Sequence, residues 1–100
     1  MKDLREKVAI ITGSSSGVGA ATARLLASQG CHIVINYNSN ADGARACADA
    51  CAQHGVQTLI CQGNVAEDAA CRELARAALD KWGRIDVLVN NAGTTKFVEH

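Results

Sequence analysis

The residues best suited to chemistry form a glycine- and serine-rich segment directly after an apolar run. The segment reads Thr12-Gly13-Ser14-Ser15-Ser16-Gly17-Val18-Gly19. Gly13 permits a tight turn, Gly17 lets the backbone approach a ligand closely, and Gly19 lets a helix pack against the preceding strand. A helix that begins here points unpaired N–H groups and the positive end of its dipole at the turn. The segment therefore predicts a cradle for phosphate groups, with an ordinary strand-to-helix loop as the alternative.

A second polar segment, Asn90-Asn91-Ala92-Gly93, follows another apolar run near the end of the sequence. If the two apolar runs are neighbouring parallel strands, both polar segments lie at the carboxyl ends of those strands. Ligands of open α/β sheets bind at that edge, where the strand order reverses. The two segments are therefore predicted to form one site.

The elements that position these segments follow from the hydrophobic pattern, which alternates between apolar runs and longer mixed stretches. Strands are predicted at residues 7–12, 33–35, 56–61 and 85–90, and helices at residues 17–29, 41–54 and 67–82. Continuous apolar strands separated by helices indicate a parallel sheet that is covered on both faces. Right-handed crossovers then predict the strand order 3-2-1-4, the first half of a doubly wound α/β fold.

The composition narrows the class of protein. Nearly half of the 100 residues are apolar, enough for the core of one small domain or of part of one. Ten basic residues balance ten acidic ones, and no basic cluster interleaves with aromatic residues, so nucleic-acid binding is not expected. The apolar run near the N-terminus is too short for a signal peptide or a membrane span. No membrane association and a cytoplasmic location are therefore expected.

The chain has five cysteines, and none of them forms a C-x-x-C motif. Cys47 and Cys51 are four residues apart on a predicted helix, a spacing able to hold a metal. The usual zinc sites need a second pair of ligands, and the sequence offers none. Buried free thiols in a reducing compartment, without a metal, are therefore expected.

The motif pair Thr12-Gly13-x-x-x-Gly17-x-Gly19 and Asn90-Asn91-Ala92-Gly93 closely resembles that of the short-chain dehydrogenases/reductases. The spacing between the motifs and the order of the elements match as well, over essentially the whole chain. The resemblance, nearest to sugar dehydrogenases and ketoacyl reductases, implies a three-layer αβα Rossmann fold. It also implies an NAD(P)(H)-dependent oxidoreductase that interconverts an alcohol and a ketone or aldehyde, acts on a small molecule and forms a homodimer or homotetramer.

The resemblance also implies which residues contact the cofactor. They are Thr12, Gly13, Ser14, Ser15, Ser16, Gly17, Val18, Gly19, Asn36, Tyr37, Asn38, Ser39, Asn64, Val65, Asn90, Ala92 and Gly93. Asn64 stands where family members carry an aspartate. Its carbonyl oxygen is able to accept from the adenine amine, and the Val65 N–H to donate to the ring; alternatively Asn64 only caps the region before the third helix. Asn91 is expected to be mainly structural.

The segment after the second strand bears on the choice of cofactor. Tyr37 stands where NAD-binding proteins carry an acid that binds the ribose 2′-hydroxyl. Without that carboxylate nothing repels a 2′-phosphate, and Asn36, Asn38 and Ser39 are able to bond one. No arginine follows, however, and Ser16 occupies a turn position that is often basic in NADP users. NADP is therefore favoured, with NAD retained, and a merely polar loop is the alternative.

The catalytic residues of the family are not found in these 100 residues. The resemblance implies a serine and a Tyr-x-x-x-Lys motif, but the one tyrosine is Tyr37 and no such motif occurs. The chain is therefore expected to be the N-terminal part of a single NAD(P)-binding domain, inactive alone, with the catalytic part beyond residue 100. An end at His100 would leave Val87 and Val89 exposed on an open strand edge. The alternatives are a non-catalytic dinucleotide-binding or sensing module and a fragment without a function of its own.

Overall fold

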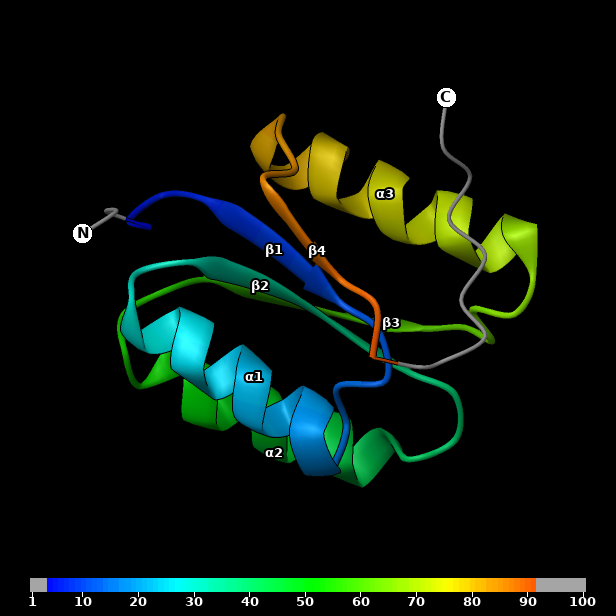
Figure 1. Cartoon of the computed structure of the whole chain (residues 1–100), viewed down its shortest axis with the longest axis horizontal. Coiled ribbons are helices and arrows are strands. Elements are labelled where there is room, and N and C mark those ends of the chain that lie inside the picture. The colour runs from blue at the N-terminus through cyan, green and yellow to red at the C-terminus, as the bar shows by residue number, and fades with distance from the viewer. Residues whose placement is uncertain (1–3, 92–100) are drawn as a thin grey trace.

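Four parallel strands form one sheet in the order β3-β2-β1-β4 (Figure 1). The computed structural model describes residues 4–91. The elements are β1 (Val8–Ile11), α1 (Gly17–Ser28), β2 (His32–Tyr37), α2 (Ala41–Ala52), β3 (Thr58–Gln62), α3 (Asp68–Trp82) and β4 (Val87–Val89). The predicted element order and the strand order 3-2-1-4 are thus confirmed.

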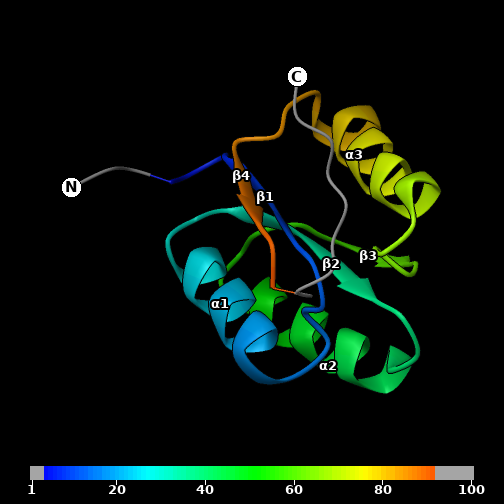
Figure 2. The ribbon, with the colours of Figure 1, turned by 45° about the vertical axis from the view of Figure 1, so that its right-hand side comes forward.

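The helices form the outer layers of the fold. Helices α1 and α2 cover one face of the sheet and α3 covers the other, as both ribbon views show (Figures 1 and 2). The central strand β1 is buried along its whole length because it has a strand on each side and helices on both faces. Alternate side chains enter opposite cores: Ala9 and Ile11 face the α1 and α2 layer, whereas Val8 and Ile10 face α3.

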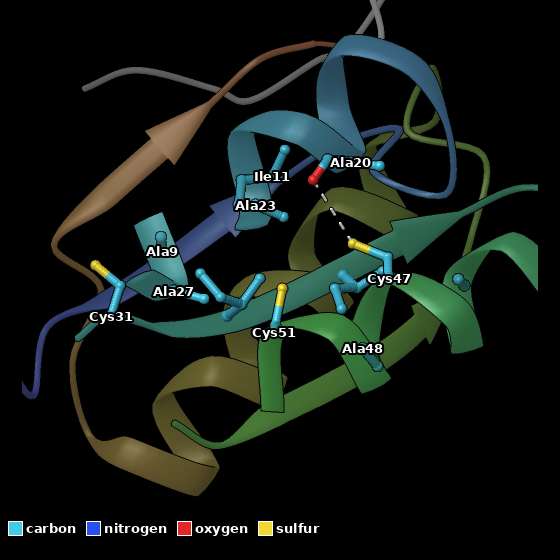
Figure 3. Close-up of a cluster of buried hydrophobic side chains, with 12 residues drawn as sticks. Ala9, Ile11, Ala20, Ala23, Ala27, Cys31, Cys47, Ala48 and Cys51 are labelled. Carbon is cyan, nitrogen blue, oxygen red and sulfur yellow. Dashed lines mark hydrogen bonds between the residues drawn. The ribbon is translucent and has the colours of Figure 1, made fainter. Parts of the chain in front are cut away.

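The core between the sheet and the paired helices is made of small side chains (Figure 3). Helix α1 contributes Ala20, Ala23 and Ala27, and α2 contributes Cys47, Ala48 and Cys51, all of them buried. Such side chains let the two helices lie close to each other and to the strands. The alanine-rich stretches of the sequence therefore account for the close packing of α1 and α2 on this face of the sheet.

The boundaries of the strands differ from the predicted ones in ways that pairing explains. Strand β2 runs on to Tyr37 because β3 continues to pair with it: the register with β1 ends at Ile35, but Tyr37 is still in register with Gln62 of β3. Strand β4 begins later, at Val87. Before it, Asp86 donates its N–H to the Val8 carbonyl oxygen and accepts the Val8 N–H on its carboxylate, 2.9 Å in each case.

The exposure of β4 corrects one expectation. Val87 and Val89 are half-buried because both pack against the core under α1 and α2. Leu88, between them, points to the other face and is 46% exposed. The apolar surface of this edge strand is therefore centred on Leu88.

The helices, the possible metal ligands and the cysteines of residues 4–91 bear on three further expectations from the sequence. None of the helices within residues 4–91 is long and apolar enough to cross a membrane. The same residues contain no group of three or more histidine, cysteine or acidic side chains placed to hold a metal ion. All five cysteines are free thiols, four of them buried and Cys61 partly buried.

Candidate functional site

The glycine-rich turn and the end of β4 are bonded directly to each other. The Thr12 N–H donates to the Val89 carbonyl oxygen at 3.1 Å, and the Thr12 hydroxyl accepts from the Asn91 N–H at 3.0 Å. The Asn91 side-chain amide donates to the Gly13 carbonyl oxygen, also at 3.0 Å. Asn91 thus has the structural role expected of it, and the two polar segments share the carboxyl edge of the sheet.

The end of β2 fixes the turn from its other side. Ser14 and Asn36 are buried and exchange two 3.0 Å hydrogen bonds: the Ser14 N–H donates to the Asn36 carbonyl oxygen, and the Asn36 N–H donates to the Ser14 hydroxyl. The Asn36 side-chain oxygen accepts from the Gly13 N–H at 3.0 Å. Its side-chain nitrogen donates to the Gly63 carbonyl oxygen at 3.1 Å. The Asn36 amide therefore positions the turn against β3 instead of facing solvent, where a phosphate would bind.

The glycines of the turn have the conformations that a close backbone approach requires. Gly13 and Gly17 have φ values of 62° and 60°, in the left-handed region that side chains disfavour. A Cβ on Gly19 would lie 2.6 Å from the Asn91 side-chain nitrogen and closer still to the Gly13 carbonyl oxygen. A Cβ on Gly17 would meet no atom within 4 Å. Gly19 is therefore needed for packing, whereas the space over Gly17 is open for a ligand.

The start of α1 is suited to an anion. Ser16 is the N-cap, its side chain makes no capping bond, and the first turn carries no acidic residue. At the start of α2, by contrast, the Asn40 side chain accepts from the Gly43 N–H at 3.0 Å, and Asp42 lies in the first turn. The positive end of the α1 dipole therefore faces the turn, and no acidic side chain in the first turn of α1 neutralises it.

The exposed part of the turn consists of Ser16, Gly17 and Val18, while Ser15 is half-buried. Val18 is 74% exposed, which is high for a branched apolar side chain. It therefore offers an apolar contact beside the phosphate cradle. Ala92 and Gly93 lie outside the described residues, and Asn90, two residues before Ala92, is exposed.

The segment after β2 passes beside the turn without presenting a carboxylate at its first positions. Tyr37 is half-buried against the core under α1 and α2, and Asn38 and Ser39 are exposed. The first acid of this segment is Asp42, which pairs with Arg45 on the surface of α2. The side chains of Asn38 and Ser39 are therefore accessible to a ligand, whereas the Asn38 carbonyl oxygen accepts from the Gln62 side chain at 3.2 Å.

Asn64 and Val65 follow β3 at the same edge of the sheet. The Asn64 side-chain oxygen accepts from the Ala66 N–H at 3.0 Å, and its carbonyl oxygen accepts from the Glu67 N–H at 2.9 Å. These bonds shape the approach to α3, whose N-cap is Glu67. Val65 is buried against α3. The contacts that the structure gives Asn64 are thus those of the capping alternative, and its contact with adenine stays a prediction.

A groove of about 400 Å³ between α1 and α2 continues from the turn. Its lining includes Ser15 and Ser16 of the turn, Arg24 of α1, and Gly43 and Cys47 of α2. Arg24 is not among the site residues predicted from the sequence. Its spacing in the sequence could have indicated it. Ser16, Ala20 and Arg24 follow one another at four-residue intervals and therefore share one face of a helix.

The floor of this groove has an unusual thiol. The Cys47 thiol lies 4.0 Å from the Ala20 carbonyl oxygen, to which it donates (Figure 3). A hydrogen bond from Cys51 lowers the pKa of Cys47 to about 7; burial opposes that shift and the Arg24 charge assists it. The same hydrogen bond, together with burial, raises the pKa of Cys51. Arg24 and Cys47 thus line the same groove, one from α1 and the other from α2.

A larger hollow, of about 630 Å³, lies at the opposite edge of the sheet and contains none of the predicted site residues. Two histidines, His32 and His54, are part of its lining. The His32 ring stacks on Trp82 with centroids 5.5 Å apart and accepts the Gln57 N–H at 3.0 Å. These contacts give His32 a structural role between β2, β3 and α3.

Comparison with known proteins identifies the family of the chain. The model of the short chain dehydrogenase family matches residues 7–100. A 3-oxoacyl-[acyl-carrier-protein] reductase of Synechocystis sp. is 42% identical over 96% of this chain and 39% of its own length. Glucose 1-dehydrogenase 2 of Bacillus subtilis is 36% identical over 92% of this chain and 36% of its own length.

A solved structure agrees with these relatives. The crystal structure of a short chain dehydrogenase from Burkholderia cenocepacia, in complex with NADP, has a TM-score of 0.86 and is 34% identical. It matches 91% of this chain, which spans 37% of that protein. On the family match, the relatives and the fold, the chain belongs to the short-chain dehydrogenase family of oxidoreductases.

Proposed function

We propose that the protein to which this chain belongs is an NAD(P)(H)-dependent oxidoreductase that interconverts an alcohol and a ketone or aldehyde. The observation that carries the proposal is the junction at the carboxyl edge of the sheet. There the Asn91 side chain bonds the Gly13 carbonyl oxygen, so that the end of β4 and the uncapped start of α1 face one ligand. A nicotinamide cofactor, when bound, would supply the hydride for reduction of the carbonyl and accept it in oxidation of the alcohol.

The residues of this chain act by binding and orientation. The N–H groups at the start of α1 hold the pyrophosphate, and Gly17 leaves room for it. Thr12, Asn36 and Asn91 keep the turn in place through bonds to three strands. Asn90, with the following Ala92 and Gly93, borders the ribose nearest the nicotinamide.

The proposed cofactor is NADP(H), with NAD(H) as the second choice. The support is the absence of a carboxylate at Tyr37, Asn38 and Ser39, where an acid would bind the ribose 2′-hydroxyl and repel a 2′-phosphate. The similar Burkholderia cenocepacia enzyme was solved with NADP.

The chain spans 39% of the Synechocystis relative and 36% of the Bacillus subtilis one. We therefore place residues 1–100 as the N-terminal part of a single cofactor-binding domain, inactive alone, whose catalytic residues lie elsewhere in the whole protein. We propose a small-molecule substrate with a hydroxyl or carbonyl group. The name of the Bacillus subtilis relative supports the small molecule, and the name of the Synechocystis relative supports the carbonyl group, there on an acyl chain attached to a carrier protein. We further propose a homo-oligomer, and a cytoplasmic location, which the five free thiols support.

The experiment uses the whole protein in two assays. Fluorescence titration with NADPH and NADH measures cofactor binding. Oxidation of NADPH by 3-oxoacyl thioesters and simple aldehydes, and reduction of NADP⁺ by glucose and simple alcohols, measures turnover. Binding with turnover supports the proposal. Binding without turnover across the panel favours the non-catalytic sensing module, and absence of binding contradicts both.

A further inference from the structure

The groove between α1 and α2 begins at the outer side of the phosphate turn. Ser15 and Ser16 line its upper end and Gly43, in the first turn of α2, lines the facing wall. A Cβ on Gly43 would collide with the Ser15 carbonyl oxygen. The turn and the start of α2 are therefore locked in close contact, and the shape of this end of the groove is fixed.

The groove lies where the ribose of an adenine nucleotide is expected. The chain passes from Tyr37 through Asn38 and Ser39 to the start of α2, so the segment that recognises the 2′ position leads to the rim of the groove. The phosphates are expected over Gly17, at its other rim. A group attached to the 2′ oxygen therefore points toward this space.

Arg24 is the one charged residue among the described residues that line the groove. Within residues 4–91 it forms no salt bridge, in contrast to Arg45, which pairs with Asp42, and Arg84, which pairs with Asp86. The acid nearest the start of α2 is thus already neutralised by Arg45. The Arg24 charge is left available for a mobile anion.

The direction of the Arg24 side chain follows from its place on α1. Side chains of an α-helix tilt toward its N-terminus, so Arg24 extends toward Ala20 and Ser16. Ala20 is small and leaves the path to the turn open. The Ser16 hydroxyl, which makes no capping bond, is the polar group at the end of that path.

We propose that Arg24, with the Ser16 hydroxyl, binds the 2′-phosphate of NADP(H) in the groove between α1 and α2 and so determines the preference for NADP(H) over NAD(H). A guanidinium forms strong paired hydrogen bonds with a phosphate. The arginine comes from the second turn of α1, and it compensates for the missing basic residue at Ser16 and after Tyr37. This assignment rests on the proposed dinucleotide function.

The test measures the affinity of the whole protein for NADPH, NADH, 2′,5′-ADP and 5′-AMP by calorimetry. Arg24→Gln should weaken NADPH and 2′,5′-ADP by about ten- to a hundredfold, while NADH and 5′-AMP change less than about twofold. Arg24→Lys should recover part of the loss because it restores the charge without the paired geometry. Arg76→Gln, which removes an exposed arginine from α3 on the opposite face of the sheet, is the matched control and should leave all four affinities unchanged.

The outcomes separate this assignment from the proposed function. Equal weakening of the phosphorylated and unphosphorylated ligands by Arg24→Gln, or no weakening, overturns the assignment and leaves the dinucleotide function standing. Tighter binding of NADH than of NADPH by the unaltered protein also overturns the Arg24 assignment and leaves the dinucleotide function standing. Failure of the unaltered protein to bind any of the four ligands overturns both.

Discussion

The side-chain nitrogen of Asn91 donates a 3.0 Å hydrogen bond to the carbonyl oxygen of Gly13, although 78 residues separate the two along the chain. The same nitrogen lies against the place where a Cβ of Gly19 would be. One amide therefore joins the end of β4, the phosphate turn and the first turn of α1. The relative positions of these three parts depend on it.

Replacement of Asn91 should separate structural from binding roles. Asn91→Ala leaves the Gly13 carbonyl oxygen without this donor and should lower the free energy of unfolding by about 1–3 kcal/mol. Asn90→Ala, at the exposed neighbour, should change stability by less than about 0.5 kcal/mol yet weaken cofactor binding. Urea unfolding and cofactor titration of both variants measure this. Equal stability of the two variants would show that the Asn91 bond contributes nothing.

The open space over Gly17 can be tested against a matched glycine. Gly17 and Gly55 both have positive φ, 60° and 82°, and neither has an atom within 4 Å of its Cβ position. Alanine at either position should therefore cost a similar strain, about 1–2 kcal/mol. Only Gly17→Ala should also weaken NADPH binding, by about tenfold or more, because its methyl group enters the phosphate site. Comparable affinities of the two variants would remove Gly17 from the site.

Asn36 should tolerate no carboxylate. Asn36→Asp replaces the amide that donates to the Gly63 carbonyl oxygen with a buried anion, and should destabilise the fold by about 2–4 kcal/mol at neutral pH. Burial would raise the pKa of the new carboxyl, so part of the loss should be regained as the pH falls and the group becomes a donor. Asn38→Asp, at an exposed position, is the control. The free energy of unfolding of both variants is measured from neutral to acid pH. If the loss of stability in Asn36→Asp did not change with pH, the buried donor role of Asn36 would be contradicted.

Asp86 should make the link between β1 and β4 sensitive to pH. The Arg84 guanidinium, and next the Val8 N–H, hold the pKa of Asp86 below its ordinary value of 3.8. The stabilisation is therefore complete above that value and lost as the pH falls through the lower folded pKa. Asp86→Asn keeps an acceptor for Val8 but removes the charge, so the variant should be slightly less stable at neutral pH. Chemical denaturation should show the two proteins converging in acid, and a constant difference would exclude the charge as the cause.

The layers of the fold could be predicted because each strand is a continuous apolar run bounded by a helix. Strand ends were less predictable, since β2 is extended by its pairing with β3 and β4 is shortened where Asp86 replaces a backbone partner. These effects depend on neighbouring strands, which no local pattern reveals.

The roles of single site residues were harder to predict than the location of the site. Asn36 is a polar residue at a strand end, and nothing local distinguishes an exposed ligand-binding amide from a buried one that holds Gly13 and Gly63. Arg24 has a visible spacing from Ser16, but the groove that gives it a role exists only because Gly43 lets α2 contact the turn.

The most direct test of the central claim is titration of the whole protein with NADPH and NADH, with Gly17→Ala as the site variant. The predicted result is saturable binding of one dinucleotide per chain, tighter for NADPH, and clearly weakened for both in Gly17→Ala but not in Gly55→Ala. Absence of saturable binding, or binding that Gly17→Ala leaves unchanged, would contradict the assignment of the Thr12–Gly19 turn as the dinucleotide site.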